Sequence, residues 1–152
     1  MSHPEIIVSE APNPADREAI LQPLLSYNDS KGPPSGFQPL AILLRDPNTK
    51  LTVGGLWGKS SYGWVFVELL VVPERWRGQN VGTLLLRKAE VVGRERNCVG
   101  IWLKTFGFQA RGFYEKNGFE LFGSLDNYPR GSSCYFLRKL LEPEKRGSEP
   151  PS

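Results

Sequence analysis

The sequence predicts an α/β (α+β) fold in a single domain, with a mixed β-sheet of about seven strands and helices on both faces. Apolar runs and helix-like spacings follow one another in the order β-α-β-β-β-α-β-α-β-β. This order combines hairpins with strand–helix–strand crossovers, so antiparallel and parallel strands are expected in one sheet. The 152 residues, 39% of them hydrophobic, suffice for one domain with a buried core.

The first third of the chain predicts a strand, a helix and a loop. Residues 5–9 (EIIVS) form a short β-branched run that is typical of a strand. Asn13 and Pro14 then resemble a helix N-cap followed by proline at the first helical position. Apolar residues continue with helical spacing, and Pro23 is expected to kink or shorten that helix. Residues 30–36 (SKGPPSG) have the composition of a loop.

Three strands are expected next. Residues 39–45 and 51–57 are apolar runs separated by 46–49 (DPNT), which predicts a hairpin. A longer strand follows over residues 64–72 and stops at Pro73.

The pattern then changes to that of an amphipathic helix. Apolar residues recur at steps of three and four over residues 81–92, which gives the helix one apolar face. Glu90 and Arg94 are four residues apart and are expected to pair on the solvent-facing side.

The rest of the chain predicts three strands and a short helix. The strands are expected over residues 99–106, 119–125 and 133–141, and the helix over residues 109–117, ended by a glycine. Residues 142–152 are rich in Pro, Glu, Lys, Gly and Ser and are expected to form a flexible tail. The predicted domain therefore covers residues 1–141.

Composition excludes several classes of protein. Nineteen basic residues against sixteen acidic ones give a net charge of only +3, without the clustered basic face of a nucleic-acid binder. Cys98 and Cys134 form no metal-ligand spacing, so no metal site is expected. No signal peptide and no apolar run of about 20 residues is visible. A cytoplasmic protein without membrane or nucleic-acid partners is expected.

The most informative segment is the loop over residues 72–83, between a buried strand and a helix. Such a junction directs unpaired backbone N–H groups and the positive helix end at one point, which favours an anion. Gly78 and Gly82 permit close approach of a ligand, and Arg77 adds a charge. The segment matches neither a Walker loop nor a Rossmann fingerprint. Taken alone, such a loop is more often a glycine-containing connector between a strand and a helix.

Two motifs give the sequence a family resemblance. Residues 77–82 (RGQNVG) resemble the coenzyme A pyrophosphate loop of the GNAT superfamily of N-acetyltransferases. Residues 110–119 (ARGFYEKNGF) resemble the family's helix with the pattern Ala-x-x-Phe-Tyr-x-x-x-Gly-Phe. Residues 105–110 are similar to those of a poorly assigned bacterial branch. Asn80 and Gly107 depart from the family pattern, although Asn tolerates left-handed backbone angles.

The resemblance implies acetyl-CoA as the co-substrate and no metal. It places the coenzyme against the end of the long strand and the following loop. The residues expected to bind it are Leu70, Val71, Val72, Arg77, Gly78, Gln79, Asn80, Val81, Gly82 and Thr83.

Acetyl transfer to an amine needs a base for the amine and an acid for the departing thiolate. Glu68, a carboxylate among apolar strand residues, is the candidate base, and an ion pair with an arginine such as Arg75 is the alternative. Alternation places Glu68 on one face with Phe66 and Leu70 unless a bulge intervenes. Resemblance points to Tyr114 as the general acid, and a purely packing role is its alternative.

The sequence therefore predicts an acetyl-CoA-dependent N-acetyltransferase. The acetyl group passes to a primary amine of a small molecule or peptide by direct attack on the thioester. A non-catalytic acyl-CoA-binding sensor of the same fold is the alternative. A homodimer through the C-terminal strands is expected, and the sequence does not identify the amine.

Overall fold

The computed structural model describes residues 2–142. The chain divides into two compact units, one ending at Pro34 and the other beginning at Ser35. The single domain over residues 1–141 stays a prediction. The expected tail lies, after Glu142, outside the described residues.

The first unit contains helix α1 (Pro14–Lys31). Asn13 caps it as expected: its side chain accepts a hydrogen bond from the Asp16 backbone N–H at 3.0 Å, and Asp16 accepts one from the Asn13 N–H at 2.9 Å. The expectation that Pro23 shortens the helix is wrong, because proline removes one backbone hydrogen bond and the rest of the helix continues. Residues 5–9 form no strand.

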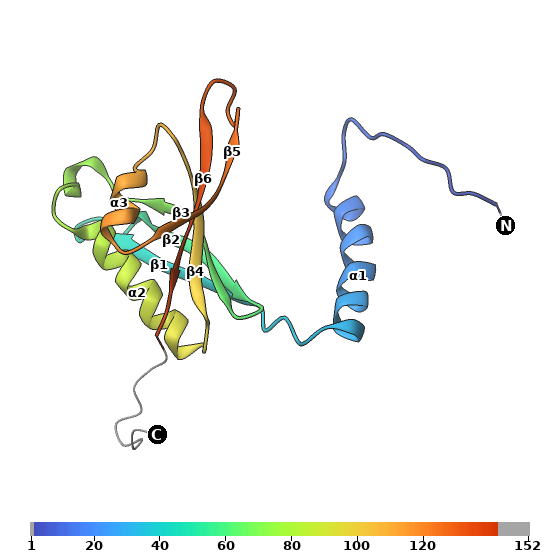
Figure 1. The fold of residues 1–152 in the computed structure, drawn as a ribbon, viewed down its shortest axis with the longest axis horizontal. Helices are drawn as coiled ribbons and strands as arrows, with labels where there is room; N and C mark the ends of the chain where they lie inside the picture. The colour runs from blue at the N-terminus through green and yellow to red at the C-terminus, as the bar shows by residue number, and fades with distance from the viewer. Residues whose placement is uncertain (1, 143–152) are drawn as a thin grey trace, which may run out of the picture. The chain divides into compact units, whose positions relative to one another are not determined.

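The second unit is built on a mixed sheet, shown in Figure 1. Its strands in the described residues are β1 (Gln38–Arg45), β2 (Thr52–Ser61), β3 (Trp64–Val71), β4 (Gly100–Phe106), β5 (Glu120–Asp126) and β6 (Ser133–Leu140). The spatial order is β1-β2-β3-β4-β6-β5. The β3–β4 pair is parallel and the others are antiparallel. The predicted mixed sheet and the hairpin of β1 and β2 are confirmed. In the described residues the sheet has six strands instead of about seven, and residues 5–9 are not a strand.

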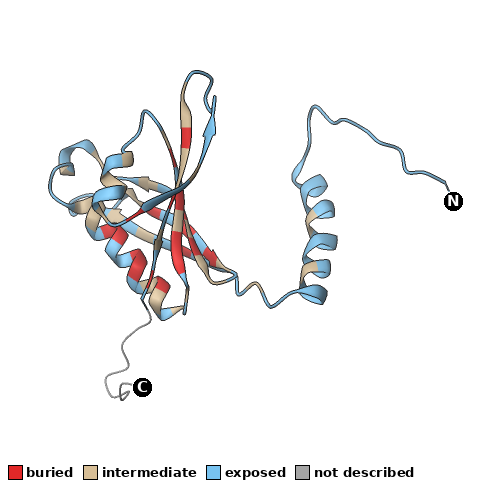
Figure 2. Cartoon of the chain, in the orientation of Figure 1, coloured by how far each residue is buried: buried red, intermediate tan, exposed pale blue. Residues whose placement is uncertain are grey.

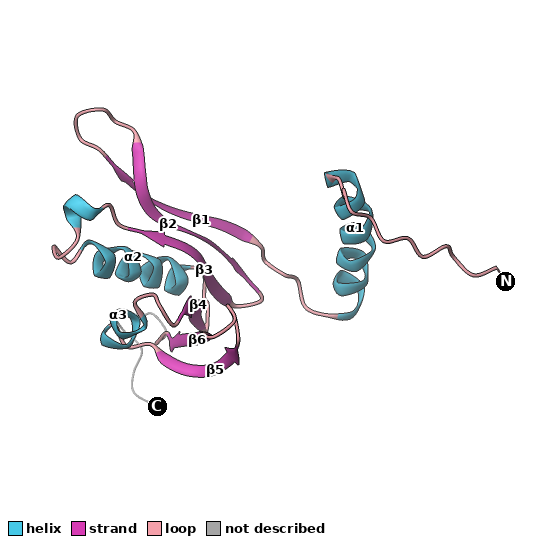
Figure 3. Cartoon of the chain, turned by 90° about the horizontal axis from the view of Figure 1, so that it is seen from above, coloured by secondary structure: helices cyan, strands magenta, loops and turns pink. Residues whose placement is uncertain are grey.

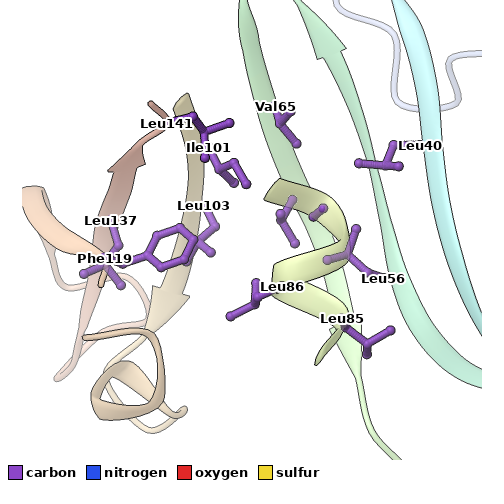
Figure 4. Close-up of a cluster of buried hydrophobic side chains, with 12 residues drawn as sticks. Leu40, Leu56, Val65, Leu85, Leu86, Ile101, Leu103, Phe119, Leu137 and Leu141 are labelled. Carbon is purple, nitrogen blue, oxygen red and sulfur yellow. The ribbon is translucent and has the colours of Figure 1, made fainter. Parts of the chain in front are cut away.

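Helices α2 (Val81–Glu95) and α3 (Arg111–Lys116) pack on the same face of this sheet, as Figure 3 shows. The prediction of helices on both faces is thus not met by the described helices of this unit. Buried residues follow the inner side of α2 and the central strands in Figure 2. Leu85 and Leu86 of α2 lie in one buried cluster with the strand residues Leu56 and Ile101, as Figure 4 shows. This core fixes the start of α2 against the end of β3, where the site lies.

One prediction about α2 is wrong. Glu90 was expected to face solvent, yet it is only 6% exposed. Its carboxylate lies 2.7 Å from the Lys139 ammonium on β6 and 3.9 Å from Arg94. The carboxylate tolerates burial because two cations lie beside it.

Asp46 ties the β1–β2 turn to the loop after β3. Its carboxylate accepts hydrogen bonds from the backbone N–H groups of Thr49 and Asn48, at 2.9 and 2.8 Å, and lies 2.7 Å from the Arg75 guanidinium. These bonds, those from the two backbone groups first, lower the pKa of Asp46 below its ordinary value of 3.8.

A carboxylate whose pKa is lowered by folding stabilises the protein above its unfolded pKa and stops doing so as the pH falls through the folded pKa. We therefore expect Asp46→Asn to lower the melting temperature at pH 7 and to have little effect at the most acidic pH at which the fold persists. Thermal melts of both proteins across this range test this. An equal loss at every pH would contradict it.

Candidate active site

Strands β3 and β4 separate where the site begins. Their parallel pairing ends at Val67 and Leu103, while β3 stays paired with β2 as far as Val71. The edge of residues 68–71 that faces away from β2 is therefore left without a strand partner. Backbone N–H and C=O groups on such an edge are available to a ligand.

A β-bulge lies at the point of separation. Trp57 pairs with Leu69 and Gly58 pairs with Val67, so Glu68 is the extra residue of β3. The bulge breaks the alternation that would place Phe66 and Leu70 on one face. Phe66 lies opposite the core and stacks on Trp102 at 4.4 Å, whereas Leu70 packs against the core on the helix side.

Glu68 is exposed at this bulge. Within residues 2–142 its side chain takes part in no hydrogen bond or ion pair. The alternative of an ion pair with Arg75 is not found, because Arg75 pairs with Asp46 and its guanidinium stacks 4.4 Å from the Trp76 ring. The Glu68 carboxylate is thus unengaged at the point where β3 and β4 part.

The loop before α2 has the backbone that an anion site requires. Gly78 and Asn80 have φ values of +80° and +62°, so Asn80 adopts the left-handed conformation that asparagine tolerates. The Arg77 side chain donates from Nε to the Val72 carbonyl at 3.1 Å, which ties the loop to the end of β3. The two Nη groups of Arg77 remain for a ligand.

The start of α2 carries no cap. Its first backbone hydrogen bond runs from the Leu84 N–H to the Asn80 carbonyl at 3.0 Å, so the amides of Val81, Gly82 and Thr83 have no acceptor within the helix. Asn80 makes no side-chain cap hydrogen bond, and the first turn holds no acidic residue. This end of the helix therefore favours a negative ligand.

Gly82 has a further reason to be glycine. A Cβ at this position would lie 2.9 Å from the ring carbon Cζ of Phe113. The glycine thus permits α3 to pack closely against α2. A side chain at Gly82 would displace Phe113 as well as any ligand, so Gly78, which has open space around its Cα, is the better position for a test.

Tyr114 lies on α3 between two other aromatic rings. Its ring centroid is 5.2 Å from that of Phe113 and 6.0 Å from that of Phe119, both in edge-to-face geometry. Burial raises the pKa of the Tyr114 hydroxyl above its ordinary value of 10.0. The hydroxyl therefore keeps its proton at neutral pH.

A cavity of about 640 Å³ brings these features together. It is lined by Leu70, Val72, Trp76, Arg77, Gly78, Asn80, Val81, Gly82, Thr83, Arg87, Ala110, Phe113, Tyr114, Lys116 and Asn117. Most residues expected to bind the coenzyme are among them, but Val71 and Gln79 are not. The candidate base Glu68 is not among the lining residues either. Val71 lines a hollow that includes Trp57 and Leu69, and Gln79 turns back to donate to the Arg75 carbonyl at 3.3 Å.

The model of the acetyltransferase (GNAT) family matches residues 10–119, more than half of the chain. The chain belongs to the GNAT acetyltransferase family. It is 36% identical over 133 residues to a curated acetyltransferase of Agrobacterium fabrum, covering 88% of this chain and 96% of that relative. It is 39% identical over 89 residues to the blasticidin-S acetyltransferase of Streptomyces morookaense, covering 58% of this chain and 65% of that relative.

Solved GNAT structures agree with the fold. A protein from Agrobacterium tumefaciens assigned as an acetyltransferase superposes with a TM-score of 0.85 at 34% identity, covering 90% of this chain and 99% of that one. An aminoglycoside 6'-N-acetyltransferase complexed with coenzyme A has the same fold, with a TM-score of 0.62 at 19% identity, covering 92% of this chain and 99% of that one. The protein is therefore an acetyl-CoA-dependent N-acetyltransferase.

The cavity of this GNAT enzyme fits the phosphates of its co-substrate. The free amides of α2 and the side chain of Arg77 supply hydrogen-bond donors. Arg87 and Lys116 add two cations that the sequence motifs did not indicate. Arg87 follows Thr83 by four residues, so both lie on one side of α2. This spacing is the signal in the sequence that indicates Arg87 as a residue of the cavity. Residues 2–142 contain no cluster of His, Cys, Asp and Glu that could hold a metal, and no helix long and apolar enough to cross a membrane.

Proposed function

We propose that this N-acetyltransferase binds acetyl-CoA in the cavity between α2 and α3 and passes the acetyl group directly to a primary amine. One observation carries the proposal. The uncapped start of α2, Leu70 of β3, Val72 directly after that strand, and Tyr114 all line the same cavity. The helix end proposed to bind phosphate and the proposed proton donor thus line one cavity.

The binding roles follow from the charges and the donors. The amides from Gly78 to Thr83 hold the pyrophosphate, helped by the positive end of α2 and by the Nη groups of Arg77. The unpaired edge of β3 at Leu70 and Val71, with Val72 directly after the strand, binds the arm of the co-substrate by backbone hydrogen bonds. An N–H of this edge also binds the thioester oxygen as negative charge develops on it.

Acetyl-CoA supplies an activated acetyl group as a thioester. The amine nitrogen forms the new bond to the acetyl carbon, and the carbon–sulfur bond breaks. Glu68, which is exposed at the bulge, takes a proton from the amine directly or through water. Tyr114 donates its hydroxyl proton to the sulfur, and the proton lost by the amine balances the one gained by the thiolate.

The acceptor is a small molecule or a peptide with a primary amine. The relative that acetylates blasticidin S supports a small molecule. Mixing the enzyme and acetyl-CoA with a panel of amines, and measuring free CoA thiol, tests this. We expect release with at least one small primary amine, whereas release with no amine, or with secondary amines alone, would overturn the proposal.

Two further predictions accompany this proposal. A cytoplasmic location follows from the need for acetyl-CoA. A homodimer through the C-terminal strands predicts twice the chain mass, which light scattering on a size-exclusion column measures. A monomer at micromolar concentration would contradict the dimer.

A matched pair of substitutions at Gly78 tests whether the loop before α2 binds the pyrophosphate. Gly78→Asp and Gly78→Asn place side chains of equal size on a residue with φ of +80° and open space around it, so backbone strain is similar in both. Only the aspartate adds a negative charge near the phosphates. We expect acetyl-CoA to bind Gly78→Asp at least about tenfold more weakly than Gly78→Asn by calorimetry.

Salt provides the control for this pair. The difference between the two variants should shrink as ionic strength rises, because exposed charges are screened. Equal affinities at low salt in two folded proteins would remove the pyrophosphate from this loop.

A further inference from the structure

An ion pair between buried Glu90 and half-buried Lys139 connects α2 and β6 to the end of α3. The Lys139 ammonium lies 2.7 Å from the buried Glu90 carboxylate and also donates a hydrogen bond to the Asn117 carbonyl at 2.9 Å. A single cation thus contacts both helices that form the walls of the cavity.

Asn117 is in turn bonded to the residues around the proposed acid. Its backbone N–H donates to the Tyr114 carbonyl at 3.0 Å, and its side-chain Nδ2 donates to the Phe113 carbonyl at 2.8 Å. Helix α3 has only six residues, too few to be stable without outside contacts. Whatever fixes Asn117 therefore fixes the position of Tyr114.

The neighbouring glycine makes room for this contact. Gly118 has a φ of +90°, and a Cβ on it would lie 3.1 Å from Cε of Lys139. A larger residue at Gly118 would push the lysine away from Asn117. The glycine of the motif thus serves the approach of Lys139 as well as the backbone turn.

We propose that Glu90 and Lys139 are positioning residues, which hold α3 so that the Tyr114 hydroxyl faces the sulfur of the co-substrate. This inference rests on the proposed role of Tyr114 as the acid. Buried ion pairs often add little net stability, because desolvation offsets their attraction. Small displacements of a reacting group, in contrast, lower rates steeply.

The test removes both charges together, so that no buried charge is left alone. The double variant Glu90→Leu/Lys139→Met is expected to fold. We expect its kcat to fall about tenfold or more, with acetyl-CoA affinity nearly unchanged. Lys139→Arg keeps a cation beside Glu90 and should retain more of the wild-type kcat than the double variant does.

The same double variant is then made in a Tyr114→Phe protein. If the ion pair acts through the Tyr114 hydroxyl, removing the pair should have almost no further effect on kcat in the Tyr114→Phe background. An equal fall in both backgrounds, or no fall in either, would overturn the inference while leaving the role of Tyr114 intact. A wild-type kcat in Tyr114→Phe alone would instead overturn the proposed acid.

Discussion

Tyr114→Phe is expected to lower kcat about 100-fold or more while changing acetyl-CoA affinity little. The substitution removes one oxygen and keeps the ring that packs between Phe113 and Phe119. Without this hydroxyl, the side chain at position 114 has no proton to donate to the thiolate, which affects only the chemical step. Steady-state kinetics with calorimetry of acetyl-CoA separate the two quantities.

A structural role for Tyr114 gives a different pattern. The variant would then melt at a different temperature and turn over at the wild-type rate. Because product release could hide the chemical step, the comparison is repeated in single turnover with a slow acceptor. A wild-type rate in both experiments would exclude Tyr114 as the acid.

Glu68→Gln is expected to have the second large effect, on kcat/KM at neutral pH. Amines are mostly protonated there, and the enzyme must remove a proton before or during attack. We expect a fall of about 100-fold near pH 7 that becomes smaller at high pH, where free amine is abundant. The measurement is kcat/KM against pH for wild type and variant.

The shape of the two profiles decides this role. If the profiles superimpose, Glu68 takes no part in the reaction. Glu74→Gln serves as the control, because Glu74 is another exposed carboxylate, in the short 3₁₀ helix that follows β3. Its profile should match that of the wild type.

The sequence predicted the parts of the fold that depend on local chemistry. The Asn13 cap, the β1–β2 hairpin and the left-handed Asn80 each follow from the preferences of a few adjacent residues. The two motifs, thirty residues apart, also identified the loop and helix that meet at the cavity.

What the sequence did not predict depends on contacts between distant segments. The burial of Glu90 requires Lys139 from another strand, and the close packing of Gly82 requires Phe113. The expected strand over residues 5–9 does not form although its residues are strand-like, because β propensity depends strongly on context. The bulge at Glu68 likewise appears only in the pairing of β2 with β3.

A crystal structure with acetyl-CoA tests the central claim most directly. We expect the pyrophosphate against the amides of residues 78–83 and the thioester sulfur within hydrogen-bonding distance of the Tyr114 hydroxyl. The acetyl group should lie beside the free edge of β3, with the Glu68 carboxylate accessible to an amine. A co-substrate bound outside this cavity, or a sulfur turned away from Tyr114, would contradict the proposed site.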